Sequence, residues 1–233
     1  MAAVGKAEVT HILITHTHSD HSPLARQLKG RTGARTYGFG PHGARRHADG
    51  VQMEEAGDIA FKPDVTVRDG DLIAGDGWTF ECVFTPGHTS NHMCFALKDE
   101  KAFFPGDHVM GWNTSVVIPP DGRMADYIAA LERLVGRDDA TYLPGHGGAI
   151  TEPQRTVRAY LVHRRLREQA ILDAIRAGHD TIRTIVPAVY RGLDPRLSAA
   201  AALSVEAHVV HLLEQLRLRS SGPSTSTARL SPA

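Results

Sequence analysis

The sequence predicts a mixed α/β fold that is followed by a small helical block. Between residues 9 and 150, short apolar runs alternate with helical patterns, and polar, glycine-containing loops follow several of these runs. From residue 151 to 219 the pattern is helical, without a convincing strand. Residues 220–233 are rich in Ser, Thr and Pro and are expected to form a disordered tail. We therefore expect an α/β domain at 1–150, a helical subdomain at 151–219 and a tail at 220–233.

The strand predictions rest on short apolar or alternating runs that end at turn residues. Val9–Ile14 has few polar interruptions, which is typical of a strand buried on both faces. Residues 78–84 alternate and stop at Pro86-Gly87. The remaining expected strands are 34–37, 65–67, 72–73, 92–97, 102–104 and 140–143, of which 92–97 and 102–104 form a hairpin around a charged tip.

Helices are expected where apolar residues recur at helical spacing. The first begins near Ser22, with Pro23 well placed in its first turn. A second covers residues 126–135 and precedes the last strand of the α/β domain. The helical block follows with segments at 154–177, 181–190 and 198–218, the first of which ends at Gly178. Strands and helices mixed in this way indicate the α/β or α+β class.

Composition excludes several functional classes. The 233 residues contain 26 Lys+Arg and 26 Asp+Glu, so no net basic excess favours nucleic acid or a membrane surface. The two cysteines, Cys82 and Cys94, lie in apolar runs and are expected to be buried thiols. No run approaches the length of a membrane span and no signal-peptide pattern is present, so we expect a cytoplasmic protein without a membrane partner.

Histidine is enriched, and five of the 14 histidines fall in motifs that could bind metal. Residues 16–21, directly after the first strand, contain three imidazoles and a carboxylate. Three later segments place His or Asp after a strand and a Pro-Gly pair, where glycine lets the backbone turn sharply. Imidazole and carboxylate without thiolate suit Zn²⁺ and are acceptable to Mn or Fe. The candidate ligands are His16, His18, Asp20, His21, His88, Asp107 and His146.

These motifs resemble those of the metallo-β-lactamase superfamily of dinuclear metal hydrolases, over roughly residues 9–148. The resemblance implies an αββα sandwich and two divalent ions per chain. Zinc is the expected metal, with Mn or Fe as alternatives. It places His16, His18 and His88 on one ion and Asp20, His21 and His146 on the other, with Asp107 bridging both. A hydroxide shared by the ions would be the nucleophile, and Asp20 is the candidate catalytic residue that orients it and carries its proton.

Within the superfamily, the chain is most similar to the lactamase-β-like hydrolases related to a mitochondrial endoribonuclease. The likeness rests on residues 111–115 and 122–127 and on a helix at 164–172 that leads into a winged-helix-like block. We expect hydrolysis of a small ester, thioester or lactone. The alternatives are a glyoxalase II-like thioesterase and an endoribonuclease for single-stranded RNA, with phosphate contacts from Arg164, Arg165 and Arg167. A non-enzymatic binding module is a further class, which the complete ligand set disfavours.

Two loops are expected to border the cleft. Residues 111–127 begin four positions after Asp107 and offer Asn113, Thr114 and Ser115 as substrate-binding residues, while His42 and His47 are weaker candidates. His92 is expected to support the site or fill the core, and His108 to point away from it. A small molecule is the expected partner, and a homo-oligomer is compatible with the sequence.

The start of the chain leads to one further expectation. In the family that the chain resembles, several strands precede the His-x-His-x-Asp-His motif, and one of them ends in Asp-x-Gly. Only residues 1–15 precede the motif here, without Asp-x-Gly. An apolar strand at 9–14 needs neighbours that pair its backbone groups. We therefore expect an N-terminally truncated first sheet, or a paired chain that completes it.

Overall fold

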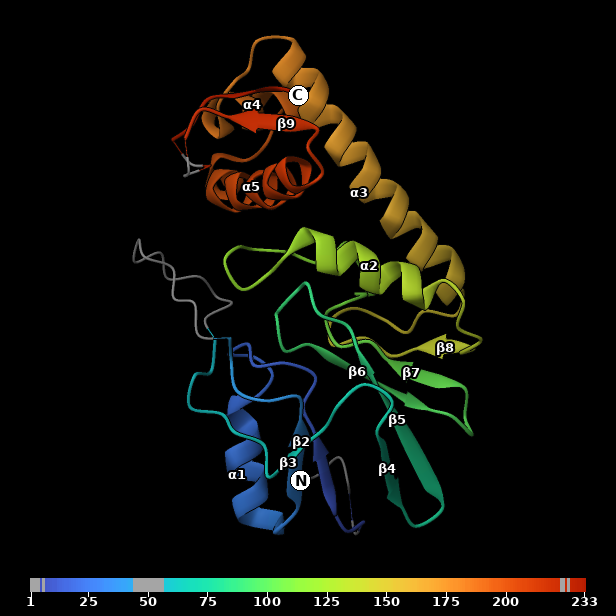
Figure 1. The fold of residues 1–233 in the computed structure, drawn as a ribbon. Helices are drawn as coiled ribbons and strands as arrows, with labels where there is room; N and C mark the ends of the chain where they lie inside the picture. Colours follow the sequence, from blue (N-terminus) through green and yellow to red (C-terminus); the bar gives the residue numbers. More distant parts are fainter. Residues whose placement is uncertain (1–4, 6, 44–56, 223–224, 226) are drawn as a thin grey trace.

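The computed structural model describes residues 5, 7–43, 57–222, 225 and 227–233. Two sheets lie against each other between two helices, as Figure 1 shows. The first is parallel and has the order β1-β2-β3, with β1 (His11–Leu13), β2 (Arg35–Gly38) and β3 (Val65–Thr66), and α1 (Pro23–Thr32) packs on it. This arrangement and the second sheet confirm the expected sandwich.

The second sheet has the order β4-β5-β6-β7-β8 and is antiparallel except for its last pair. Helix α2 (Met124–Leu134) packs on its outer face. The alternation in β5 explains the layering, since Cys82 points between the two sheets and Val83 points under α2. Both cysteines are free and buried, as expected. The strands are β4 (Leu72–Gly75), β5 (Trp78–Phe84), β6 (Met93–Leu97), β7 (Ala102–Phe104) and β8 (Thr141–Tyr142).

The C-terminal block contains three helices and a short two-stranded ribbon. Its helices are α3 (Pro153–Arg176), α4 (Ile182–Val189) and α5 (Ser198–Glu214), with a 3-10 turn, η2 (Pro195–Leu197), before α5. Strands β9 (Leu218–Ser220) and β10 (Leu230–Pro232) pair antiparallel. The predictions of a strandless block and of a disordered tail at 220–233 are therefore wrong. Leu230 is the reason, because it is buried beside Leu218 in the apolar cluster of this block.

Helix α3 belongs to two hydrophobic cores. Its first half buries Val157 and Leu161 against α2 and the second sheet. Its second half buries Ile171 and Ile175 against α4 and α5. The boundary expected at residue 150 therefore precedes a helix that continues the core of the α/β domain, as its long diagonal course in Figure 1 illustrates.

Contrary to the expectation that no run approaches the length of a membrane span, one segment of the described chain, Pro195–Glu214, is long and apolar enough to cross a membrane by length and composition. Within the fold it is a core helix of the C-terminal block. Val205, Val209 and Leu212 are buried in the cluster that α3 and α4 complete. Core helices commonly meet the same length and composition criteria, so the segment is weak evidence for a membrane span.

Candidate metal centre

The candidate ligands meet because they follow strands that end on the same side of the sandwich. Residues 15–21 leave the end of β1, and His88 follows β5 after a turn. Asp107 follows β7 and His146 follows β8, the parallel neighbour of β7. Side chains in these positions are held by paired strands, which gives a site of fixed geometry.

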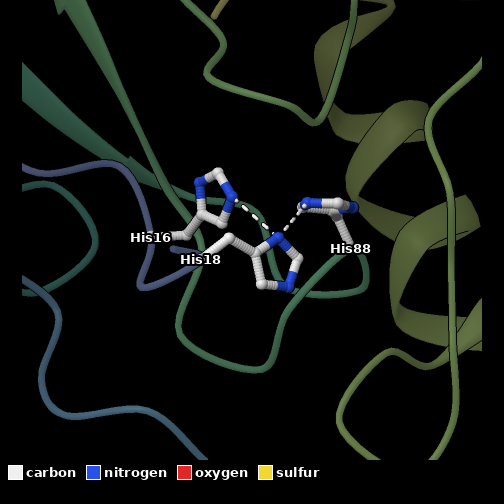
Figure 2. Close-up of side chains that lie close together, drawn as sticks. All are labelled: His16, His18 and His88. Atoms are coloured by element: carbon white, nitrogen blue, oxygen red, sulfur yellow. Dashed lines mark hydrogen bonds between the residues drawn. The ribbon is translucent and has the colours of Figure 1, made fainter. Parts of the chain in front are cut away.

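The first group consists of three buried histidines, His16, His18 and His88. The His18 Nδ1 atom lies 3.1 Å from His16 Nε2 and 3.1 Å from His88 Nε2, as Figure 2 shows. The three ring nitrogens therefore face a common point.

The second group is Asp20, His21 and His146. The Asp20 Oδ2 atom lies 3.0 Å from His146 Nε2 and 3.5 Å from His21 Nε2, and the two histidine nitrogens are 3.3 Å apart. Asp20 is half exposed, so this group faces solvent on one side.

Asp107 lies between the two groups. Its Oδ1 atom is 3.4 Å from His21 Nε2, and its Oδ2 atom is 3.3 Å from His146 Nε2 and 3.9 Å from His88 Nε2. Oδ1 is buried and accepts no hydrogen bond from the described residues. A buried carboxylate oxygen normally has a hydrogen-bond partner or a cation, so this oxygen fits a cation shared by the two groups.

Electrostatics favour neutral imidazoles in the first group. Burial lowers the pKa of His16 and His88, and it lowers the pKa of His18 to about 3. The Nδ1 atom of His88 donates to the carbonyl of Val116 at 2.6 Å, which leaves a lone pair on the Nε2 atom that faces the group. Neutral imidazoles with converging lone pairs are what a divalent cation requires.

Charge–charge interactions between carboxylates and histidines set the pKa values in and around the second group. Burial lowers the pKa of His21, but the neighbouring Asp107 and Asp20 carboxylates outweigh burial and the net pKa is raised. Burial raises the pKa of Asp107, and His21, His88 and His146 outweigh that effect, so its net pKa is lowered. The residues of both groups thus fit two divalent ions that Asp107 would share.

Two further buried groups hold Asp107 in place. His92 accepts a hydrogen bond from the Asp107 amide on Nε2 at 3.2 Å, and its Nδ1 contacts Thr85 Oγ1 at 2.9 Å. The hydroxyl of Ser115 donates to the carbonyl of Asp107 and, at 2.9 Å, to that of His108. His92 therefore supports the site as the sequence suggested.

Gly87 is required for the turn that presents His88. Its φ is +132°, and a Cβ atom there would lie 2.3 Å from the backbone of Tyr127. We expect Gly87→Ala to lower the free energy of unfolding by about 2 kcal/mol and to weaken zinc binding. Urea unfolding and a chelator competition measure the two effects. Gly136→Ala is the control because a Cβ atom at Gly136 meets nothing within 4 Å; equal stability of the two variants would contradict the expectation.

The predicted substrate-binding residues occupy different environments. Asn113 is exposed and Thr114 is half-buried, so both can face a ligand. Ser115 is 2% exposed and bonded to backbone carbonyls, so it supports the loop from below instead of forming its surface. His42 contacts Thr17 Oγ1 at 2.9 Å beside the first group, and His47 lies outside the described residues.

Two predicted orientations concern His108 and the arginines of α3. His108 is buried against the Tyr127 ring, with ring centroids 4.7 Å apart, and lies outside the ligand groups as expected. Arg164 is 3% exposed, so the prediction that it contacts phosphates is wrong. Its burial could not be recognised from the sequence. The first half of α3 packs on the α/β domain and the second half packs on α4 and α5, so the helix has no single polar face.

Sequence reasoning missed Trp112 as a site residue. This side chain is 74% exposed, and its ring is stacked on that of His146 with centroids 6.2 Å apart and an angle of 9° between the planes. Its position beside Asn113 was the available signal, but apolar side chains usually suggest burial. Trp112 therefore lies at the solvent-exposed edge of the candidate centre, beside His146.

Comparisons with known proteins agree with this fold. Residues 2–146 match the family model described as metallo-beta-lactamase superfamily, and residues 181–223 match that of the beta-lactamase associated winged helix domain. A beta-lactamase-like protein 2 homolog from Drosophila melanogaster is 30% identical over 221 residues, which are 92% of this chain and 72% of that protein. An atrochrysone carboxyl ACP thioesterase from Cryptosporiopsis is 30% identical over 171 residues, which are 73% of this chain and 47% of that protein.

A solved metallo-beta-lactamase family protein from Thermus thermophilus has the same fold, with a TM-score of 0.80 at 21% identity; the match covers 100% of this chain and 83% of that one. The chain spans about half the length of the fungal curated relatives it matches. The first family model covers more than half of the chain. The chain therefore belongs to the metallo-beta-lactamase superfamily, with a beta-lactamase-associated winged helix domain at its C-terminus.

Proposed function

We propose that this superfamily hydrolase uses two divalent ions, with zinc as the preferred metal, to cleave a small thioester. Esters and lactones are related substrates. The observation that carries the proposal is the position of Asp107, whose two oxygens face His21 and His146 of the second group while Oδ2 also lies 3.9 Å from His88 of the first group. The choice of a thioester is supported by the relative that is named a thioesterase, at 30% identity. A cation pair, when bound, lowers the pKa of water and polarises a carbonyl oxygen.

The chain's own residues would then bind the substrate and move the proton. Asp20 lies at the solvent side of the second group, with Oδ2 3.0 Å from His146 Nε2. In thioester hydrolysis, the water oxygen bonds to the acyl carbon, the carbon–sulfur bond breaks, and one water proton ends on the leaving thiolate. Asp20 is placed to accept that proton and to pass it on, so we propose it as the catalytic residue.

The exposed loop beside His146 would bind the substrate, so Trp112 is expected to affect affinity more than chemistry. Trp112→Ala should raise KM for the best thioester about tenfold, because it removes an aromatic contact worth about 1.5 kcal/mol. Zinc content should not change. Steady-state kinetics with metal analysis checks this. Asn113→Ala should change the relative kcat/KM values of the active substrates and also leave the zinc content unchanged. Unchanged kinetics for both variants on every active substrate would contradict this assignment of the loop.

The ribonuclease alternative depended on three arginines of α3. Arg164 is buried, Arg165 pairs with Glu132 at 3.5 Å, and Arg167 lies over the Tyr190 ring at 4.0 Å. Burial withdraws Arg164 from a phosphate, whereas Arg165 stays exposed and its surface ion pair would not prevent such a contact. We therefore make RNA cleavage an outcome of the test.

The test is a parallel assay of the zinc-reconstituted chain on four substrate classes. Short acyl thioesters of a pantetheine-like thiol, matched oxygen esters, lactones and a short single-stranded RNA are each incubated with the protein, with and without a chelator. We expect the highest kcat/KM on a thioester and its loss on chelation. Zinc-dependent cleavage of RNA alone would overturn the thioesterase proposal in favour of the ribonuclease.

A further inference from the structure

Helix α3 holds the loop that follows Asp107 at several backbone carbonyls. Tyr160, which is 7% exposed, donates its hydroxyl to the carbonyl of Met110 at 2.6 Å and to that of Asn113. One turn further along the helix, the Nη2 atom of Arg164 donates to the carbonyl of Ser115. Both side chains therefore attach the C-terminal block to residues 110–115.

The Ser115–Val116 segment is in turn bonded to two candidate ligands. The Ser115 hydroxyl donates to the carbonyl of Asp107, so the position of Ser115 affects the backbone conformation of Asp107. The next carbonyl, that of Val116, accepts from His88 Nδ1 at 2.6 Å and fixes the orientation of that ring. Arg164 thus lies one hydrogen bond away from groups that orient both Asp107 and His88.

A second contact holds the Arg164 guanidinium beside the loop that it binds. Its guanidinium lies 4.8 Å from the centre of the Tyr127 ring, which gives a cation–π contact. The Tyr127 hydroxyl donates at 2.9 Å to the carbonyl of His108, the neighbour of Asp107. A buried guanidinium is costly unless its donors are used; within the described residues Nη2 donates to the loop, while the buried Nε has no partner.

We propose that Arg164 is a positioning residue for the metal centre, so that α3 sets the geometry of Asp107 and His88 through the Ser115–Val116 segment. This inference rests on the proposed function. It gives the C-terminal block a role in metal affinity, in addition to any role in substrate binding. Groups that orient metal ligands commonly change metal affinity 10- to 100-fold when they are removed.

The experiment compares Arg164→Met and Arg164→Lys in the full chain, with Arg158→Met as a control because Arg158 is exposed on the same helix. Zinc affinity is measured by chelator competition at a temperature at which circular dichroism shows every variant folded, and kcat and KM are measured in parallel. We expect Arg164→Met to weaken zinc binding by about tenfold or more and to lower kcat with little change in KM. Arg164→Lys should recover part of the affinity because Lys can donate to the Ser115 carbonyl, and the control should match wild type.

Wild-type zinc affinity in folded Arg164→Met would overturn the inference, because a merely structural role would change stability alone. If that variant does not fold, Ser115→Ala removes the link to Asp107 while Arg164 stays, and wild-type affinity in Ser115→Ala would overturn the inference too. A wild-type chain that holds fewer than two zinc ions would instead refute the proposed function on which the inference rests.

Discussion

Asp107→Asn is expected to release one of two zinc ions per chain and to lower thioester hydrolysis more than about 100-fold. The substitution keeps the shape of the side chain and removes its negative charge. Its two oxygens lie 3.4 and 3.3 Å from the His21 and His146 nitrogens of the second group, and Oδ2 also lies 3.9 Å from His88 Nε2 of the first group. Removing a group that only orients a ligand costs 10- to 100-fold in affinity or activity, so losing a shared ligand should cost more.

Elemental analysis and steady-state kinetics on the same preparation measure both effects. Asp99→Asn is the matched control, since Asp99 is an exposed aspartate in the turn between β6 and β7. The control should keep the zinc content and rate of the wild type. An Asp107→Asn variant with two zinc ions and a wild-type rate would show that the carboxylate is not shared in catalysis.

Glu168→Gln is expected to destabilise the C-terminal block by about 2 kcal/mol at pH 7. Glu168 is 5% exposed on α3, and its Oε1 atom lies 2.6 Å from His211 Nδ1 and 3.6 Å from His208 Nδ1. Arg217 approaches the other oxygen at 3.7 Å. Burial raises the pKa of Glu168, but the two histidines outweigh burial and lower it to about 2. The ionised carboxylate is thus the form that the folded block stabilises.

The same pKa values give a pH dependence with a definite sign. Because the pKa of Glu168 falls from 4.5 to about 2 on folding, its contribution is complete above pH 4.5 and is lost as the pH falls toward 2. Burial lowers the pKa of His208 from 6.5 to about 4. As the pH falls from 6.5 to 4, His208 is protonated in the unfolded chain but not in the folded one, so the free energy of unfolding decreases over this range as well.

Urea unfolding from pH 3 to 7 checks these statements. The stability difference between wild type and Glu168→Gln should be largest above pH 4.5 and should shrink at pH 3. Glu132→Gln serves as the control, because Glu132 is exposed and its ion pair with Arg165 spans 3.5 Å. A difference that is as large at pH 3 as at pH 7 would show that the charge of Glu168 is not what stabilises the block.

The candidate ligands could be recognised because the sequence signals that mark them are local, whereas their division into two groups came from the family resemblance. Each candidate ligand follows an apolar strand or a Pro-Gly pair, and the periodicity of such strands is visible in the sequence. Once the strand ends share one side of the sandwich, His16, His88 and Asp107 have to meet. The strand and helix patterns gave only the α/β or α+β class, and the αββα architecture came from the resemblance to the metallo-β-lactamase superfamily.

The errors arose where long-range packing decides the structure. Leu230 is surrounded by Ser, Thr, Pro and Arg residues, a composition typical of disorder, yet the apolar cluster of the C-terminal block buries it and β10 forms. Arg164 was expected at the surface because charged residues usually lie there, and the loop carbonyl that it binds is 49 residues away in sequence. No local pattern reveals such a partner.

The stoichiometry of bound zinc tests the central claim most directly. The chain is stripped with chelator, reconstituted with excess zinc, passed through a desalting column and analysed for zinc and protein. Two complete ligand groups that share Asp107 predict two zinc ions per chain. A value of one ion or fewer, in a chain whose circular dichroism shows that it is folded, would contradict the two-metal account.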